Sequence, residues 1–147
     1  MNDNNKVGRP PMYKTKEEIQ VMIDKYFEDC KGTVVTDTEG NPIVDKYGNI
    51  VVKDKRPLTV TGLALALGFT TRQALLNYQG KKEFVDTILR AKTIVEQYAE
   101  ERLFDKDGAN GAKFSLANNF KGWAEKQQIE ADVKNDLTIN IELSDDE

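Results

Sequence analysis

The residue types best suited to read a polar ligand stand together at positions 71–73. Thr71, Arg72 and Gln73 follow a short apolar stretch and a Gly68-Phe69 turn. Arginine matches the two major-groove acceptors of guanine, and glutamine matches the donor and acceptor of adenine. Such side chains reach base edges from the N-terminal end of a recognition helix. The chemistry that this segment favours is therefore contact with double-stranded DNA, and an ordinary helical hairpin is the alternative.

The charge of the chain is unevenly distributed. The net charge is −4, yet residues 53–92 hold eight basic and three acidic residues, and residues 1–16 carry a net charge of +3. Residues 125–147 hold eight acidic and two basic residues. Because attraction to phosphates is local under physiological screening, an acidic protein can bind nucleic acid through basic segments. A solvated charged surface would give the same pattern, so charge alone does not choose between the two.

The residue types that most catalytic sites require are missing. The sequence has no histidine and a single cysteine, Cys30, which follows Tyr26 and Phe27 in a helical pattern. This excludes a Ser-His-Asp triad, a histidine zinc site and the usual general base near neutral pH. The sequence has no glycine-rich phosphate loop and no CxxC pair, and its carboxylates do not cluster. We therefore expect no enzymatic activity, no cofactor and no metal, with Cys30 as a structural thiol.

Residues 1–14 are predicted to form a flexible basic arm. Pro10 and Pro11 exclude a helix, and Gly8-Arg9-Pro10 is the core of minor-groove hooks in which an extended backbone carries arginine into a narrow groove. Val7 stands where such hooks usually have a basic residue, so a tail with incidental charge is the alternative. The segment has no apolar core of a secretory signal, and no run of about 20 apolar residues suggests a membrane span.

Five helices are expected to position these groups within a core of residues 15–130. The first starts at the N-cap Thr15 and ends near Lys31-Gly32. Thr59 or Thr61 caps the second helix, and Thr70 or Thr71 caps the third. The tight turn between these two helices is typical of a helix-turn-helix. Residues 81–104 form a long helix with an apolar seam at positions 84, 88, 91, 95 and 98. Glycines at 108 and 111 predict a break before a last helix over residues 112–128.

Two segments are predicted to be extended. Residues 33–54 alternate β-branched residues with two Gly-containing turns, which indicates a hairpin or short meander inserted between helices. It could touch DNA, pair with a neighbouring subunit or be a passive insertion. Residues 131–147 contain an alternating strand pattern and an acidic end. Because a lone strand leaves backbone groups unpaired, it needs either the 33–54 hairpin or strands of other subunits, which could close a barrel in a ring.

Four segments, in this order, resemble the small subunits of bacteriophage terminases. They are residues 8–13, Tyr26-Phe27 before the β insertion, the Arg56-Pro57-Leu58-Thr59-Val60-Thr61-Gly62-Leu63 run continuing to Gly68, and residues 114–123 with Asn-x-Phe-x-Gly-Trp. The resemblance covers residues 8–127. Family members often have lysine where Ala117 stands and often lack Lys121. The fold class expected is mainly α, with a helix-turn-helix, an inserted β-hairpin and a C-terminal strand, assembling into a ring.

The resemblance implies that the chain binds the packaging-initiation site of viral DNA in the host cytoplasm, as a ring of about eight to ten subunits. It further implies recruitment and regulation of a large terminase subunit that carries the ATPase and nuclease. The implied DNA contacts are Thr71, Arg72, Gln73, Asn77, Lys81 and Lys82 in the core and Lys6, Arg9 and Lys14 in the arm. The implied contacts with the large subunit are Leu137, Ile139, Ile141, Leu143, Asp145 and Asp146.

Two other functions remain open at this stage. A transcription regulator with the same helix-turn-helix would bind an operator as a dimer, with half-sites about one helical turn apart. It would leave the β insertion and the C-terminal strand without a role. A carboxylate-dependent nuclease is the enzymatic alternative, against which the scattered acidic residues argue.

Overall fold

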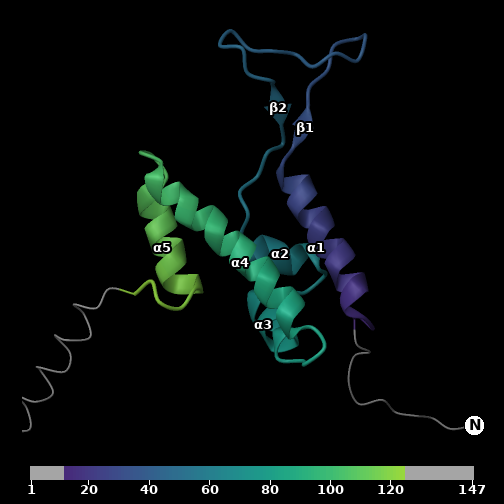
Figure 1. Cartoon of the computed structure of the whole chain (residues 1–147), viewed down its shortest axis with the longest axis vertical. Coiled ribbons are helices and arrows are strands. Elements are labelled where there is room, and N and C mark those ends of the chain that lie inside the picture. The colour runs from purple at the N-terminus through teal and green to yellow at the C-terminus, as the bar shows by residue number, and fades with distance from the viewer. Residues whose placement is uncertain (1–11, 125–147) are drawn as a thin grey trace, which may run out of the picture. The chain divides into compact units, whose positions relative to one another are not determined.

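The structure, a computed structural model, describes residues 12–124 and is mainly helical (Figure 1). One compact unit runs up to Tyr98 and a second begins at Ala99. The helices are α1 (Lys16–Cys30), α2 (Val60–Ala66), α3 (Arg72–Gln79), α4 (Val85–Glu101), the short 3-10 helix η1 (Arg102–Phe104) and α5 (Ala109–Asn119). Strands β1 (Thr33–Val34) and β2 (Val52–Lys53) pair antiparallel. The mainly helical class and the inserted hairpin are thus confirmed, whereas the predicted C-terminal strand lies outside the described residues.

The three predicted threonine caps explain where α1, α2 and α3 begin. Thr15, Thr59 and Thr71 have extended backbones, and each hydroxyl oxygen accepts a hydrogen bond from the amide three residues further on. A cap of this kind satisfies one of the amides that the first turn of a helix leaves unpaired. Because Thr59 and Thr71 stand twelve residues apart, the two caps also set the combined length of α2 and the turn before α3.

Apolar side chains hold α2 against α1 and α3. Leu63, Ala64 and Leu75 are fully buried. The small side chain of Ala64 allows α2 and α3 to approach, and its carbonyl accepts a hydrogen bond from the amide of Phe69. Gly68 makes the turn at a φ of +84°, a conformation that residues with a Cβ resist. Tyr78 supplies an apolar contact near the end of α3.

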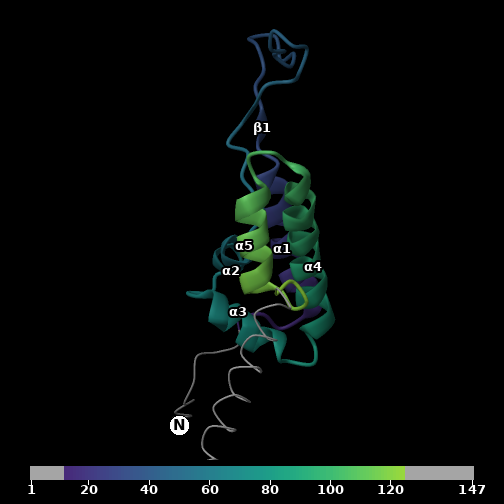
Figure 2. The same cartoon turned by 90° about the vertical axis from the view of Figure 1, so that its left-hand side faces the viewer.

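Residues 33–54, hereafter the β-arm, extend beyond the C-terminal end of α1 in both views (Figure 1, Figure 2). Three residues spaced by eight close a ring of backbone hydrogen bonds, each 2.9 Å long. Val35 donates to Val51, Val51 donates to Ile43, and Ile43 donates to Val35. The antiparallel pairs Val34–Val52, Thr36–Pro42 and Val44–Ile50 surround this ring. Three short extended segments, centred on Val35, Ile43 and Val51, therefore pair with one another in a closed triangle.

The two turns of the β-arm repeat one sequence, Asp-x-x-Gly-Asn, at residues 37–41 and 45–49. In each turn the aspartate carboxylate accepts amide hydrogen bonds from the second and fourth residues after it. These bonds lower the pKa of Asp37, chiefly through Asn41, and the pKa of Asp45, chiefly through Asn49. Both tips of the β-arm consequently carry a carboxylate that is held in its charged form.

The second half of the chain differs in part from expectation. The predicted seam is buried at Phe84, just before α4, and at Ile88, Ala91 and Val95 of α4, but the next buried residue is Ala99 rather than Tyr98. The predicted break between the last two helices is present, but it lies at residues 105–108 rather than 107–111, because η1 ends at Phe104 and α5 starts at Ala109. The last helix includes residues 112–119 as predicted but ends at Asn119, before the predicted residue 128. Burial of Ala112 and Leu116, with α5 packed on η1, outweighs the low helix propensity of Asn110-Gly111. Within residues 12–124, no helix has the length and apolar character needed to cross a membrane.

Candidate nucleic-acid interface

The N-terminal end of α3 presents the three residues predicted to read a polar ligand. Thr71, Arg72 and Gln73 are all exposed. The Thr71 hydroxyl oxygen accepts a hydrogen bond of 3.1 Å from the amide of Ala74, so this side chain caps the helix. The positive end of the helix dipole points out of the same end and favours a negatively charged group. Arg72 and Gln73 are therefore the stronger base-reading candidates, with Thr71 placing them.

The side chains of Gln73 and Asn77 are joined on the exposed face of α3. The Nε2 of Gln73 donates to Oδ1 of Asn77 over 3.0 Å. This bond uses one donor hydrogen of Gln73 and leaves its Oε1 acceptor and the Asn77 amide hydrogens pointing elsewhere. A donor and an acceptor side by side match the major-groove edge of adenine. The structure thus brings together two predicted site residues as one unit.

Two lysines follow the C-terminal end of α3. Lys81 and Lys82 are exposed, and the Lys81 ammonium lies 4.2 Å from the ring centroid of Tyr78. A cation held over an aromatic face keeps its charge but loses part of its freedom to move. The six predicted core contacts are all exposed, and each lies on α3, at its N-cap or in the turn that follows it. They are Thr71, Arg72, Gln73, Asn77, Lys81 and Lys82.

The chain immediately before α1 is fixed to the turn between α2 and α3. Tyr13 is buried, and its hydroxyl donates a 2.7 Å hydrogen bond to the carbonyl of Leu67. The hydroxyl of Tyr78 accepts from the Tyr13 amide over 3.0 Å and donates to the Tyr13 carbonyl over 2.9 Å. Burial, together with the neighbouring Tyr78, raises the pKa of Tyr13. The Tyr13 hydroxyl accordingly stays protonated and able to donate.

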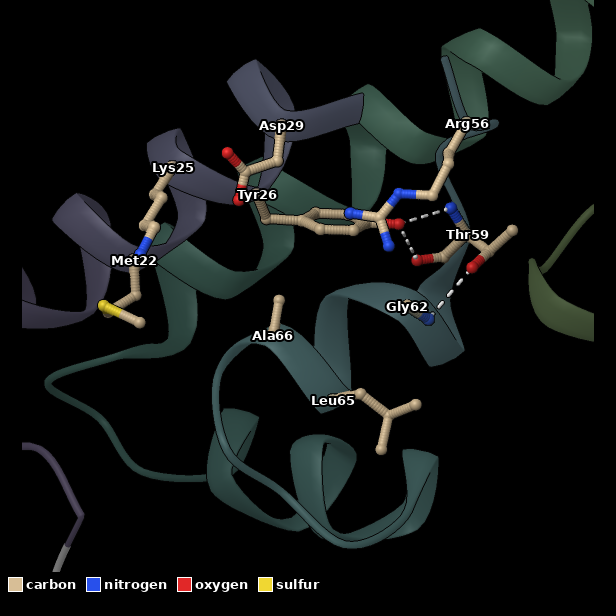
Figure 3. Close-up of a pocket in the computed structure, with 9 residues that line it drawn as sticks. All are labelled: Met22, Lys25, Tyr26, Asp29, Arg56, Thr59, Gly62, Leu65 and Ala66. Atoms are coloured by element: carbon tan, nitrogen blue, oxygen red, sulfur yellow. Dashed lines mark hydrogen bonds between the residues drawn. The ribbon is translucent and has the colours of Figure 1, made fainter. Parts of the chain in front are cut away.

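A second tyrosine, Tyr26 of α1, binds the backbone of Thr59 at the start of α2 (Figure 3). The Tyr26 hydroxyl accepts from the Thr59 amide over 3.0 Å and donates to the Thr59 carbonyl over 3.3 Å. Burial raises the pKa of Tyr26, and a Cβ at Gly62 would overlap its hydroxyl. These groups border a surface pocket of about 450 Å³ between α1 and α2. The pocket is lined by Met22, Lys25, Tyr26, Asp29, Arg56, Thr59, Gly62, Leu65 and Ala66.

The tyrosine contacts were missed from the sequence because they join residues 65 and 33 positions apart. Lys14, the one arm candidate that the structure describes, is exposed, and its amide donates to the carboxylate of Glu18. Lys6 and Arg9 lie outside the described residues. So do the predicted contacts with the large subunit at Leu137, Ile139, Ile141, Leu143, Asp145 and Asp146. Across residues 12–124, no three histidine, cysteine or carboxylate side chains gather where they could hold a metal ion.

Comparison with known proteins identifies the family of the chain. The family model described as DNA-packaging protein gp3 matches residues 8–129, which is most of the chain. No curated protein and no solved structure matches the chain. The matched region contains α3, the β-arm and α5, so it covers every element that the structure describes. The chain therefore belongs to the DNA-packaging protein gp3 family, and its role lies in the packaging of phage DNA.

Proposed function

We propose that the chain is a terminase small subunit without enzymatic activity. In this proposal a ring of about eight to ten copies binds the packaging-initiation site of viral DNA in the host cytoplasm. The ring then recruits and regulates the large terminase subunit, which supplies the ATPase and nuclease. The family match over residues 8–129 is the observation that carries the proposal.

Recognition of the initiation site is assigned to α2, its turn and α3, acting as a helix-turn-helix. The support comes from the exposed polar residues of α3, the buried contacts that fix α3 on α2, and the Gly68 turn. In this arrangement α3 enters the major groove with Arg72 and Gln73 towards the bases. Lys81 and Lys82 contact the phosphates and position the helix without reading sequence.

Assembly into a ring is supported by large apolar side chains that are partly or largely exposed in the described part of the chain. In the β-arm, Val34, Ile43, Val44, Ile50 and Val52 are between 39 and 54% exposed. In the second unit, Phe104 is 89% and Phe114 is 72% exposed. Exposed apolar groups that gather on one element are typical of protein contacts.

The charge of the β-arm argues that this segment contacts protein rather than DNA. Residues 33–54 hold four acidic and two basic residues, and the two turn carboxylates stay ionised. Negative tips would repel phosphates. The closed backbone pairing leaves no free edge at Val35, Ile43 and Val51, so a partner would dock on side chains. Of the three roles open for this insertion, we favour contact with a neighbouring subunit.

The DNA part of the proposal is tested with Arg72→Ala against Arg90→Ala, a second exposed arginine that lies on α4. Loss of a bidentate arginine–guanine contact should lower affinity for an initiation-site duplex by roughly 10- to 100-fold. Arg90→Ala should bind as the wild type does. Equal affinity of wild type and Arg72→Ala would remove the recognition-helix assignment.

The assembly part is tested by native mass spectrometry and by the motor ATPase. A closed assembly of about eight to ten chains supports the ring, whereas a dimer that protects a two-fold symmetric footprint favours a transcription regulator. Deleting residues 136–147 should abolish stimulation of the large-subunit ATPase. Unchanged stimulation would refute the assignment of that contact to the C-terminal segment.

A further inference from the structure

We propose that the second tip of the β-arm, residues 45–49, docks in the pocket between α1 and α2 of a neighbouring copy of this chain. In this contact the Tyr47 side chain enters the pocket, and the Asp45 carboxylate meets the cationic side chains at its rim. The inference rests on the ring assembly proposed above. It deepens that proposal because it names the surface that receives the β-arm.

The pocket between α1 and α2 combines an apolar wall with a cationic rim. Met22 and Leu65 supply aliphatic side chains to the wall, and Leu65 is 62% exposed. Lys25 of α1 and Arg56, which precedes α2, are exposed and border the same pocket (Figure 3). The one carboxylate among the lining residues belongs to Asp29. Two cations against one anion leave the rim with net positive charge, so it favours an acidic group.

The second tip of the β-arm presents an aromatic side chain to solvent. Within the described residues of the unit that runs up to Tyr98, Tyr47 is the most exposed large apolar side chain, at 76%. Its amide donates a 2.8 Å hydrogen bond to the Asp45 carboxylate, which fixes the backbone that carries the ring. An aromatic side chain held on a rigid turn loses little conformational entropy when a partner buries it. Tyr47 therefore suits a pocket with an apolar wall.

The Asp45 carboxylate keeps acceptor capacity for a partner. Its Oδ1 accepts from the amides of Tyr47 and Asn49 over 2.8 and 2.9 Å. Its Oδ2 accepts a single, longer bond of 3.4 Å among the described residues, from the side chain of Asn49. A carboxylate oxygen has two acceptor sites, and the bonds within the turn lower the pKa of Asp45, so the group is charged. Oδ2 can consequently accept a charge-assisted hydrogen bond from a lysine or an arginine.

The geometry of the β-arm directs its tip to another copy of the chain. The β-arm extends beyond the C-terminal end of α1, whereas the pocket lies beside α1 and α2 (Figure 1, Figure 2). The Arg56 amide donates to the Cys30 carbonyl over 3.0 Å, which joins the two ends of the β-arm at α1 and holds it in this direction. Because tip and pocket are different surfaces of one unit, their contact between copies is head-to-tail. Such contacts form a ring when the rotation closes.

The repeated turn of the β-arm supplies a matched control. Glu39 stands two residues after Asp37, just as Tyr47 stands two residues after Asp45. Both turns have the same hydrogen bonds from backbone amides to the aspartate. Glu39→Ala and Tyr47→Ala thus remove exposed side chains from equivalent positions of the two tips. Only the second tip combines a carboxylate with an aromatic ring, so only this tip should depend on the pocket.

The experiment follows the native mass of the full chain over a series of concentrations. Tyr47→Ala should raise the concentration at which the assembly half-dissociates by about 30-fold or more, as the loss of an aromatic hot spot does. Asp45→Asn, which keeps an acceptor oxygen for the turn, should raise it by about two- to fivefold, because an exposed ion pair is weak. Glu39→Ala and Asp37→Asn should leave it unchanged. Leu65→Glu, which puts a charge into the pocket wall, should act like Tyr47→Ala.

A mixture of two variants tests whether tip and pocket meet each other. The Tyr47→Ala chain keeps its pocket and lacks the tip, whereas the Leu65→Glu chain keeps its tip and lacks the pocket. Both positions are exposed, so neither change removes a buried contact within one chain. At a concentration where each variant alone is monomeric, an equimolar mixture should form heterodimers through one restored contact and nothing larger. A mixture that stays monomeric would overturn the pairing of this tip with this pocket.

Three further results separate this contact from the assembly as a whole. Equal dissociation of Tyr47→Ala and the wild type would overturn the docking, and so would an equal loss of mass in Glu39→Ala. If the wild type is a closed ring that the tip variants leave intact, the docking fails and the ring stands. If the wild-type chain itself stays a monomer or a two-fold symmetric dimer, the proposed ring fails together with the contact.

Discussion

The side-chain amides of Gln73 and Asn77 form a 3.0 Å hydrogen bond across one turn of α3, where both residues are exposed. Bonded together, the two amides have fewer rotamers open to them than two isolated amides would have. Their remaining donor and acceptor atoms are thereby preorganised for a ligand. The bond joins two residues that the sequence indicated separately as candidate DNA contacts.

We expect Gln73→Ala and Asn77→Ala to relax base preference at one and the same position of the DNA site. Each should reduce discrimination by about 1–3 kcal/mol, and the double variant should lose little more, because each change disables the pair. Competition binding against duplexes substituted at single positions measures this effect. Gln20→Ala is the control, since Gln20 makes a similar bond to Asp24 on α1. Losses at two different positions would contradict the paired reading.

The two lysines after α3 should act on affinity without acting on specificity. Lys81→Ala and Lys82→Ala are each expected to weaken specific and nonspecific duplexes equally and to reduce the salt slope by about one. Binding titrations at several salt concentrations measure both quantities. Lys46→Ala is a matched control, because Lys46 also lies over a tyrosine ring, 4.9 Å from the centroid of Tyr47, but belongs to the β-arm. A salt slope that falls with Lys46→Ala would place DNA on the β-arm.

Local signals in the sequence predicted the helix starts correctly, whereas distant pairings were out of reach. A threonine that caps its own helix acts over three residues, so Thr15, Thr59 and Thr71 were among the caps predicted. The hydrogen bonds of Tyr78 with Tyr13 and of Tyr26 with Thr59 depend on how the helices pack. No spacing along the chain indicates such bonds. The start of α5 was misplaced for the same reason, since burial of residues downstream outweighs the Asn110-Gly111 dipeptide.

One further feature was visible in the sequence and was missed. The turns at 37–41 and 45–49 repeat at a period of eight, the same spacing that separates Val35, Ile43 and Val51. A comparison of the chain with itself would have resolved the predicted hairpin or short meander into three equivalent extended segments. The sequence was sufficient to indicate which polar residues form the candidate site. The hydrogen bond between Gln73 and Asn77 was found only in the structure.

Two glycines should respond to alanine in opposite directions. Gly68→Ala is expected to destabilise the fold by about 1–2 kcal/mol, because a Cβ at a φ of +84° is strained and meets the Met12 sulfur. Gly111→Ala should stabilise by about 0.5–1 kcal/mol, because Gly111 is helical and its Cβ would meet open space. Urea unfolding measures both free energies. A neutral Gly68→Ala would show that the turn relaxes freely.

The β-arm should loosen in acid before the helices do. Because the folded-state pKa values of Asp37 and Asp45 are lowered, their stabilisation is complete well above the ordinary value of 3.8 and is lost as the pH falls through the lowered values. Amide chemical shifts of Asn41 and Asn49, followed by NMR between pH 6 and about 2, report this loss directly. Asp37→Asn should remove the titration at Asn41 and leave that at Asn49. Amide shifts that stay constant down to the lowest pH would show that these bonds do not depend on the charge.

The β-arm should also decide the size of the assembly. Ile43→Ser and Ile50→Ser replace side chains that are 40% and 54% exposed, so within one chain they remove little buried surface. If a neighbouring subunit covers them, the combined variant should shift the native mass to smaller species and weaken DNA binding through lost multivalency. Val21→Ser, at a 66% exposed position on α1, is the control for a general loss of surface hydrophobicity. An unchanged mass with intact Asn41 and Asn49 amide signals would exclude the β-arm from the subunit interface, and would leave Phe104 and Phe114 as the exposed apolar residues to test next.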